Sequence, residues 1–180
     1  MPVAAAFRPG PVLATSLAAT KLALKSLAGR YQRLSAEIAT LDTQLAQFVA
    51  VAAPALLAIK GVGPDTAGAL LVAAGDDPDR LRSEAAFARL CGVAPLPASS
   101  GKTTRHRLNR GGDRDANRAL YLLALGRMGW DSRTRDAVAR RTAEGLSKPE
   151  IIRCLKRYLA RDLYRLLTTS QLAPLPLDSP

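Results

Sequence analysis

The sequence predicts a mainly all-α protein in which a long N-terminal coiled-coil helix precedes a small helical domain containing a helix-hairpin-helix. Three observations predict this fold class. Apolar residues repeat at heptad spacing in the first third of the chain, a Gly-Val-Gly turn separates two apolar segments, and later segments carry apolar stripes at helical spacing. We expect a flexible N-terminus at 1–12, a coiled-coil arm at 13–50, the helical domain at 54–168 and a disordered, proline-rich tail at 169–180.

The arm is predicted from two apolar seams that stay in register over five heptads. Such a pattern is typical of a coiled coil, so we expect the chain to form a homo-oligomer through residues 13–50. The alternative is a long amphipathic helix that folds back on its own domain, and the orientation and number of strands stay open. One seam contains Leu17, Leu24, Tyr31, Ile38 and Leu45, and the other contains Leu13, Thr20, Leu27, Leu34, Leu41 and Phe48.

The helix-hairpin-helix is predicted just after Pro54, which ends the arm. Gly61 and Gly63 permit a tight reversal, Val62 between them plugs the core, and Pro64 suits the first turn of the next helix. The unpaired amides of this turn can bind a DNA phosphate without reading the base sequence. A plain helical corner is the alternative interpretation.

Capping residues predict where three further helices begin. Ser83 caps a short helix that ends near Cys91, and Asp113 caps a helix with an apolar stripe. Ser147 and Glu150 form a capping box that opens the last helix. The two cysteines are far apart and His106 is the only histidine, so no metal site is predicted and both cysteines are expected to be small core residues.

The charge distribution points to nucleic acid. The net charge is +11 and the isoelectric point is near 10.5. Residues 101–165 hold seventeen Lys and Arg against seven Asp and Glu. Such clustering is the footprint of a nucleic-acid binder, and the 4% aromatic content favours phosphate contact over base stacking. With no membrane-length apolar run and no signal peptide, we expect a cytoplasmic protein with no membrane partner.

The most informative segment joins small hydroxyl side chains, a glycine and dense positive charge. Ser99 and Ser100 precede Gly101 and Lys102, which is a setting for a nucleophile beside a bound phosphate, whereas the alternative is a polar turn before a solvated basic face. No acid orients His106, so a catalytic triad is not supported. The predicted nucleic-acid-binding residues are Gly61, Gly63, Lys102, Arg105, His106, Arg107, Asn109, Arg110, Arg114, Arg118, Arg153 and Arg157.

From about Leu56 to Leu167 the chain resembles the C-terminal transposase domain of the "one-ten" family of bacterial insertion sequences, relatives of the pilin-gene inversion recombinases. The resemblance covers well over half of the chain. It is carried by 61–63, Ser100-Gly101, the basic run 107–114, 117–120 and 150–157.

The resemblance implies a mechanism that the residues alone do not. Family members have an N-terminal RNase-H-like domain with four metal-binding acids, recombine DNA under the guidance of a bridge RNA, and use a serine that joins DNA covalently. By this resemblance Ser100 is the nucleophile, with Ser99 as the alternative. The chain begins at the coiled coil, so we expect it to bind no cofactor itself and to depend on Mg²⁺ from a missing acid-bearing partner domain.

These observations lead to a functional hypothesis with DNA as partner and, by the resemblance, a guide RNA. The chain is expected to be a DNA transposase or recombinase fragment that supplies a serine nucleophile for strand cleavage and joining. The alternative is a non-catalytic helix-hairpin-helix DNA-binding protein that dimerises through its coiled coil. An RNA-binding structural protein would also explain the charge but not the Ser-Gly turn.

Overall fold

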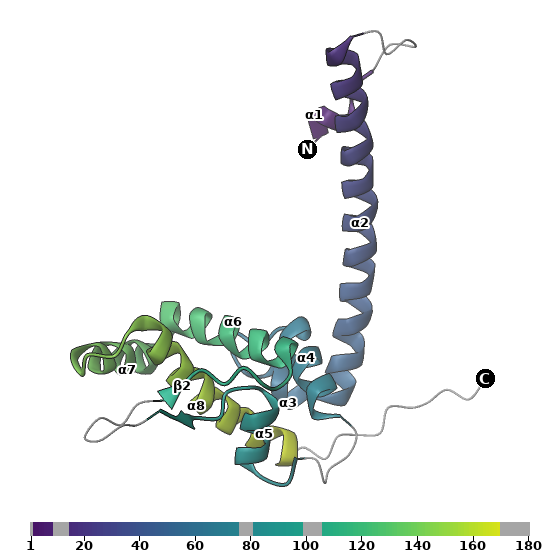
Figure 1. Cartoon of the computed structure of the whole chain (residues 1–180). Coiled ribbons are helices and arrows are strands. Elements are labelled where there is room, and N and C mark those ends of the chain that lie inside the picture. Colours follow the sequence, from purple (N-terminus) through teal and green to yellow (C-terminus); the bar gives the residue numbers. More distant parts are fainter. Residues whose placement is uncertain (1, 9–14, 76–80, 99–105, 170–180) are drawn as a thin grey trace. The chain divides into compact units, whose positions relative to one another are not determined.

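The computed structural model describes residues 2–8, 15–75, 81–98 and 106–169 (Figure 1). Within these ranges the chain forms eight helices and one two-stranded antiparallel sheet of two residues per strand. The predicted all-α fold class is therefore confirmed. Helix α1 (Pro2–Ala5) and the long helix α2 (Ser16–Ala52) come first, and α2 ends two residues before Pro54, as expected for a residue that cannot continue a helix.

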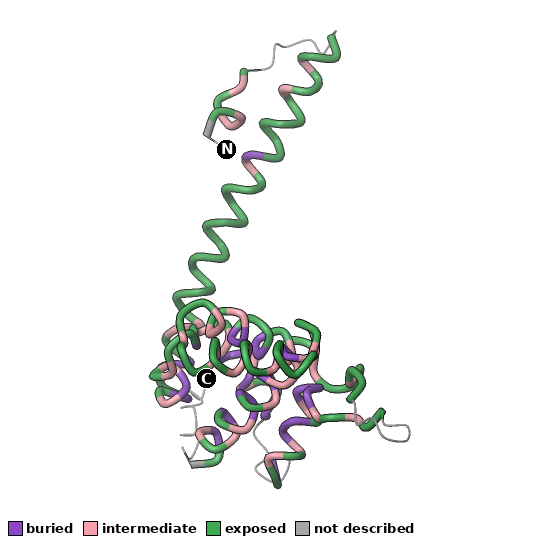
Figure 2. The backbone as a smooth tube through the Cα atoms, turned by 90° about the vertical axis from the view of Figure 1, so that its left-hand side faces the viewer, coloured by how far each residue is buried: buried purple, intermediate pink, exposed green. Residues whose placement is uncertain are grey.

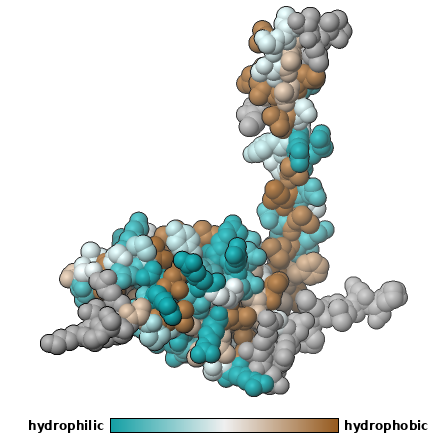
Figure 3. Space-filling view, viewed as in Figure 1, coloured by the Kyte–Doolittle hydropathy of each residue, from teal (hydrophilic) through white to brown (hydrophobic). Residues whose placement is uncertain are grey.

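The chain divides into two compact units, Met1–Gln44 and Leu45–Pro180. In the first unit the apolar seam side chains of α2 lie exposed, with 41% to 62% of their surface accessible, and they form brown patches along this helix in Figure 3. Leu13 of the second seam lies outside the described residues. The exposed seam residues of this unit are Leu17, Leu24, Leu27, Tyr31, Leu34, Ile38 and Leu41.

The second unit is a helical domain with one apolar core (Figure 2). After α3 (Pro54–Leu57), α4 (Pro64–Ala74) and α5 (Glu84–Leu90), it contains α6 (Arg114–Trp130), α7 (Ser132–Ala143) and α8 (Lys148–Thr169). Helix α6 packs against α4, α7 and α8, and α5 packs against α8. The largest fully buried side chains of this domain are Leu56, Leu70, Phe87, Cys91, Leu120 and Leu163.

The turn between α3 and α4 has the features that its sequence predicts. Gly61 adopts a φ of +92°, which favours glycine, and Val62 is only 6% exposed. Gly63 is the N-cap of α4, and Pro64 stands in its first turn. The helix before the turn, α3, is a single four-residue turn.

The caps predicted at Ser83 and Asp113 are confirmed, and one of the two hydrogen bonds of the capping box predicted at Ser147 is present. The Ser83 hydroxyl accepts a hydrogen bond from the amide of Ala86 at 3.1 Å, and the Asp113 carboxylate accepts one from the amide of Ala116 at 2.8 Å. At the start of α8, Glu150 accepts a hydrogen bond from the Ser147 amide at 2.9 Å. Each cap satisfies a backbone donor that the first helical turn leaves free.

Three features were not anticipated from the sequence. The first is α1 (Pro2–Ala5), a short helix within the segment that was predicted to be flexible. The second is α7, which begins after the N-cap Asp131 and has no fully buried residue. The third is the hairpin in which β1 (Leu96–Pro97) pairs with β2 (His106–Arg107), so that Pro97 lies opposite His106. In the sequence, the serine-bearing segment lies between these two strands.

Candidate nucleic-acid interface

Two glycine turns lock the base of the hairpin to the core. Gly92 and Gly112 have positive φ angles of +63° and +92°. A side chain at Gly92 would overlap the carbonyl oxygen of Gly111, and one at Gly112 would overlap the backbone nitrogen of Gly92. The two backbones therefore touch directly, and the Asp113 amide donates to the Leu90 carbonyl at 2.6 Å. This contact fixes where β2 lies relative to α5 and α6.

A partly buried polar network continues from this contact to α8. The side-chain nitrogen Nδ2 of Asn117 donates hydrogen bonds to the backbone carbonyls of Cys91 at 2.8 Å and Gly92 at 3.2 Å. Its side-chain oxygen accepts a hydrogen bond from the Lys156 ammonium at 2.8 Å. Lys156 is only 6% exposed. Burial, followed by the charge of Arg153, lowers the pKa of the Lys156 ammonium.

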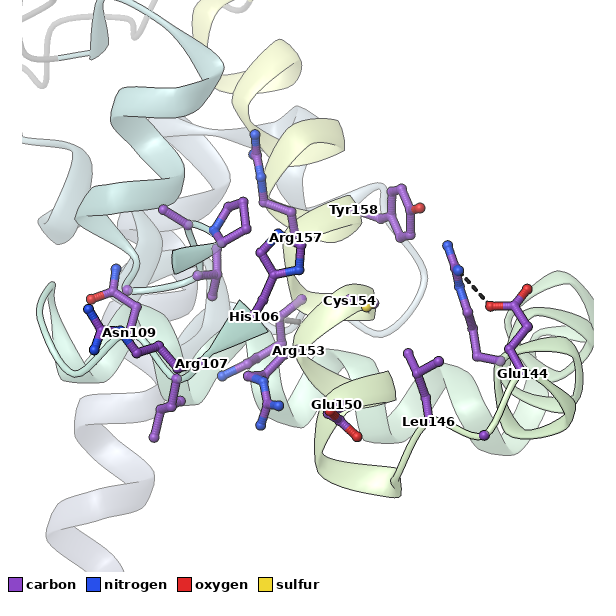
Figure 4. A pocket seen from close by; sticks show the side chains of 18 residues that line it. His106, Arg107, Asn109, Glu144, Leu146, Glu150, Arg153, Cys154, Arg157 and Tyr158 are labelled. Carbon is purple, nitrogen blue, oxygen red and sulfur yellow. Dashed lines mark hydrogen bonds and ion pairs between the residues drawn. The ribbon is translucent and has the colours of Figure 1, made fainter. Parts of the chain in front are cut away.

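Lys156 also lines a cavity of about 540 Å³ formed by β2, the loop after α5, the end of α7 and one face of α8. Figure 4 shows His106 and Arg107 on the β2 side and Arg153 and Arg157 on the α8 side, with Asn109 and Glu144 toward opposite ends of the view. The lining residues are Gly92, Val93, Ala94, Pro95, His106, Arg107, Leu108, Asn109, Arg141, Glu144, Gly145, Leu146, Glu150, Arg153, Cys154, Lys156, Arg157 and Tyr158.

The wall of this cavity carries more positive than negative charge. It contains four arginines and Lys156 against two glutamates. Glu144 forms an ion pair with Arg141 at 2.7 Å, drawn as the dashed line in Figure 4, and Glu150 caps α8. Arg157 lies 3.2 Å from Glu84 of α5. Clustered guanidinium groups with a buried ammonium suit an anion such as phosphate.

The structure brings five of the predicted binding residues to this one cavity. They are His106, Arg107, Asn109, Arg153 and Arg157, contributed by β2, the loop after it and α8. We call the eighteen lining residues together the cationic cavity.

The other described members of the predicted set lie elsewhere. Arg110 borders a second, shallower recess that it shares with Arg107 and Asn109. Arg114 and Arg118 are exposed on the first turns of α6, and Gly61 and Gly63 belong to the turn before α4. None of these residues lines the cationic cavity.

The remaining predicted site residues belong to the serine segment. They follow β1 and precede β2 in the sequence and lie outside the described residues: Ser99, Ser100, Lys102 and Arg105. Their roles therefore remain predictions.

Sequence reasoning missed Lys156 as a site residue and misplaced Cys154. Lys156 is four residues after Ile152 and four before Ala160, both of which are buried, so helical spacing alone would put it on an inward face. Cys91 is buried as predicted. Cys154 was expected to be a core residue, which is wrong: it is half-buried, because its face of α8 borders the cavity rather than the apolar core.

Among the described residues, no group of three or more His, Cys, Asp and Glu side chains is arranged to hold a metal ion. No helix in this part of the chain is both long enough and apolar enough to cross a membrane.

Comparison with known proteins points to transposases. Residues 53–139 match the family described as "Transposase IS116/IS110/IS902 family", so this segment is similar to a transposase domain of that family. The chain is also 33% identical over 115 residues to the "Insertion element IS110 uncharacterized 43.6 kDa protein" of Streptomyces coelicolor (strain ATCC BAA-471 / A3(2) / M145). That alignment covers 63% of this chain and 28% of the relative, so the chain spans only a minor part of the relative's length.

Proposed function

We propose that this chain is the DNA-binding, serine-bearing part of a DNA transposase, acting on DNA in the cytoplasm. The observation that carries the proposal is the cationic cavity at the base of the β1–β2 hairpin. It gathers predicted phosphate-binding residues from two elements that are distant in sequence. Its β2 side lies within residues 53–139, the segment similar to a transposase family, whereas its α8 side follows that segment. Phosphate contacts of this kind position DNA without reading its sequence.

In the proposed reaction, the hydroxyl oxygen of Ser100 attacks a backbone phosphorus. A new bond forms between that oxygen and phosphorus, one phosphate ester bond to deoxyribose breaks, and the departing sugar oxygen takes up a proton while the serine loses one. Ser99 is the alternative nucleophile. Lys102, Arg105, Arg107 and Arg110 offset the negative charge that develops on the phosphate oxygens.

Magnesium enters the proposal through the family resemblance, which implies that an acid-bearing partner domain holds it. Such a domain would supply the oxygen ligands that a divalent cation prefers. No step is derived through the metal here.

Two further partners belong to the proposal. A second copy of the chain associates through residues 13–50, because the exposed apolar seams of α2 match the heptad pattern of a coiled coil. A guide RNA binds the assembled protein, as the family resemblance implies, and the excess of Arg and Lys is compatible with RNA phosphates.

A covalent trapping experiment tests the serine step. The chain is mixed with Mg²⁺, the acid-bearing domain of its relatives and a nicked suicide DNA, and the protein–DNA adduct is resolved on a denaturing gel. Ser100→Ala is expected to abolish the adduct and leave DNA affinity intact, whereas Ser99→Ala has a smaller effect. If the adduct is lost in Ser99→Ala but not in Ser100→Ala, the nucleophile is Ser99. Adducts unaffected by either variant would contradict the enzymatic proposal.

A further inference from the structure

The cationic cavity contains a nearly buried cation, Lys156, and an apolar wall. A protein surface that binds only the phosphate backbone of duplex DNA needs neither of these properties. We propose that the cavity holds one unpaired nucleotide, with its phosphate on Lys156 and Arg153 and its base against Val93, Leu108 and Leu146. This inference rests on the proposed function, because it takes nucleic acid as the ligand. It adds that the strand must be unpaired or distorted at this point.

The need for an anion follows from the surroundings of Lys156. Its ammonium has three donor hydrogens, and its described hydrogen-bond partner is the uncharged oxygen of Asn117. The ion pairs seen among the described residues, Arg141–Glu144 and Arg157–Glu84, do not include it. Taking a cation out of water without a counter-charge is costly. A phosphate oxygen would supply both the missing charge and acceptors for the remaining donors.

The position of the Lys156 ammonium is set before any ligand binds. Both hydrogens of the Asn117 amide nitrogen are directed to backbone carbonyls, those of Cys91 and Gly92, so the side-chain oxygen is fixed toward Lys156. Those carbonyls belong to the turn that the glycine contact locks in place. A group held in this way loses little freedom on binding, which favours affinity for a ligand of matching shape.

The apolar wall selects a nucleotide over a bare anion. Val93, Ala94 and Pro95 line the cavity from the loop after α5, and Leu108 and Leu146 line it from other segments. Tyr158 adds an aromatic ring that lies near the guanidinium of Arg161, 5.4 Å from its centre. A volume of about 540 Å³ falls within the range of about 300 to 1,000 Å³ that small-molecule sites occupy.

A nucleotide of an intact duplex cannot occupy the cavity in this way. Bases in a duplex are stacked inside the double helix, and a base can enter a protein pocket only if it is unpaired or turned out of the stack. The occupant is therefore a nucleotide of a single strand, a bulge or a strand end.

The binding test compares two DNAs with the full chain. One is a fully paired duplex, and the other is the same duplex with one unpaired nucleotide in its centre. We expect the unpaired nucleotide to improve affinity about tenfold, and Lys156→Met to remove this preference. Lys148→Met is the matched control, because Lys148 is exposed at the start of the same helix and does not line the cavity. It should keep the preference.

A second readout locates the nucleotide without relying on any variant. Cys154 lines the cavity, whereas Cys91 is fully buried and its pKa is raised to about 12, mainly by burial. Modification by N-ethylmaleimide should therefore occur at Cys154, and the DNA with the unpaired nucleotide should slow it about fivefold relative to the paired duplex. Inorganic phosphate at high concentration should protect Cys154 far less.

Three results would overturn the inference. Equal affinity for the two DNAs, with equal protection of Cys154, would show that no unpaired nucleotide enters, while duplex binding itself would leave the proposed function standing. Protection by inorganic phosphate as strong as that by DNA would reduce the cavity to a simple anion site. A preference that persists in Lys156→Met would place the unpaired nucleotide elsewhere. Failure of the proposed function would instead appear as loss of binding to both DNAs.

Discussion

The ammonium of Lys156 donates a hydrogen bond of 2.8 Å to the side-chain oxygen of Asn117, which lies 39 residues earlier in the chain. This bond connects α8 to α6. Because the same Asn117 side chain also binds the carbonyls of Cys91 and Gly92, one amide holds together three segments that meet at the base of the hairpin. The geometry of the cationic cavity depends on it.

Replacing Asn117 should therefore destabilise the protein. Asn117→Leu leaves two carbonyls and a buried ammonium without their partner, and we expect it to lower the free energy of unfolding by about 2 to 4 kcal/mol in urea denaturation. Asn109→Leu is the control: its oxygen accepts one exposed hydrogen bond from the Gly111 amide, so about 1 kcal/mol or less is expected. Adding Lys156→Met to Asn117→Leu should recover part of the loss, and strict additivity of the two changes would contradict the coupling.

The lowered pKa of Lys156 predicts a pH dependence with a definite sign. Between that lowered pKa and the ordinary value of 10.5, the unfolded chain binds a proton that the folded chain lacks. The free energy of unfolding should therefore rise with pH in this interval, relative to Lys156→Met. The comparison also removes the opposite trend of Cys91, whose thiol ionises first in the unfolded chain above its ordinary pKa of 9.0. Urea denaturation of both proteins from about pH 7 to about pH 10 measures the difference, and a constant or falling difference would contradict the assignment.

The glycine contact predicts a large effect at one position and a small one at another. Gly112→Ala forces a side chain into the backbone of Gly92 at a φ of +92°, so we expect a loss of more than about 2 kcal/mol in thermal or urea unfolding. Gly129→Ala is the matched control on α6, where an added methyl group has open space. Because alanine favours helices, that change should stabilise the protein by up to about 1 kcal/mol. Equal effects of the two changes would mean that the two turns do not touch.

The start of each predicted helix could be derived from the sequence because capping is local. Each capping interaction joins residues that are three positions apart: Ser83 with Ala86, Asp113 with Ala116, and Ser147 with Glu150. The proline ring fixes its own backbone φ angle at Pro54 and Pro64, whatever the neighbouring residues are. Helix α7 escaped prediction because Val138 is its one large apolar side chain and most of its other residues are polar, so no apolar stripe marks it. The strands escaped because each has two residues, too few for an alternating pattern.

The candidate site could be predicted only in part. Clustered arginine indicated nucleic acid and pointed to Arg107, Arg153 and Arg157, because charge is visible in the sequence. His106 and Asn109 were predicted because they lie in the same basic run as Arg107. Helical spacing from Ile152 and Ala160 could have placed Lys156 on an inward face, but its bond to Asn117 depends on how α6 and α8 pack. A contact between residues so far apart in sequence cannot be read from local patterns.

The exposed seams of α2 predict a specific response to charge. Replacing both Leu24 and Leu34 by glutamate places carboxylates in the proposed helix–helix interface, so the mass in solution, measured by light scattering, should fall to that of a monomer. Ser26→Glu with Gln32→Glu is the control, because both residues are exposed on α2 outside the two seams. If the wild-type chain is already monomeric, or if both pairs of changes act alike, residues 13–50 do not form the proposed coiled coil.

The central claim, that the cationic cavity binds DNA phosphates, is tested most directly by measuring duplex affinity against salt concentration for two variants of equal charge. Arg107→Gln with Arg153→Gln removes two positive charges from the cavity wall, and Arg133→Gln with Arg135→Gln removes two from exposed positions of α7 that do not line it. We expect the cavity variant to bind about tenfold more weakly and to lose about two units of the slope of log affinity against log salt. The α7 variant should stay within about threefold of the wild type. Equal losses in the two variants would show that the affinity reflects total charge and would contradict the claim.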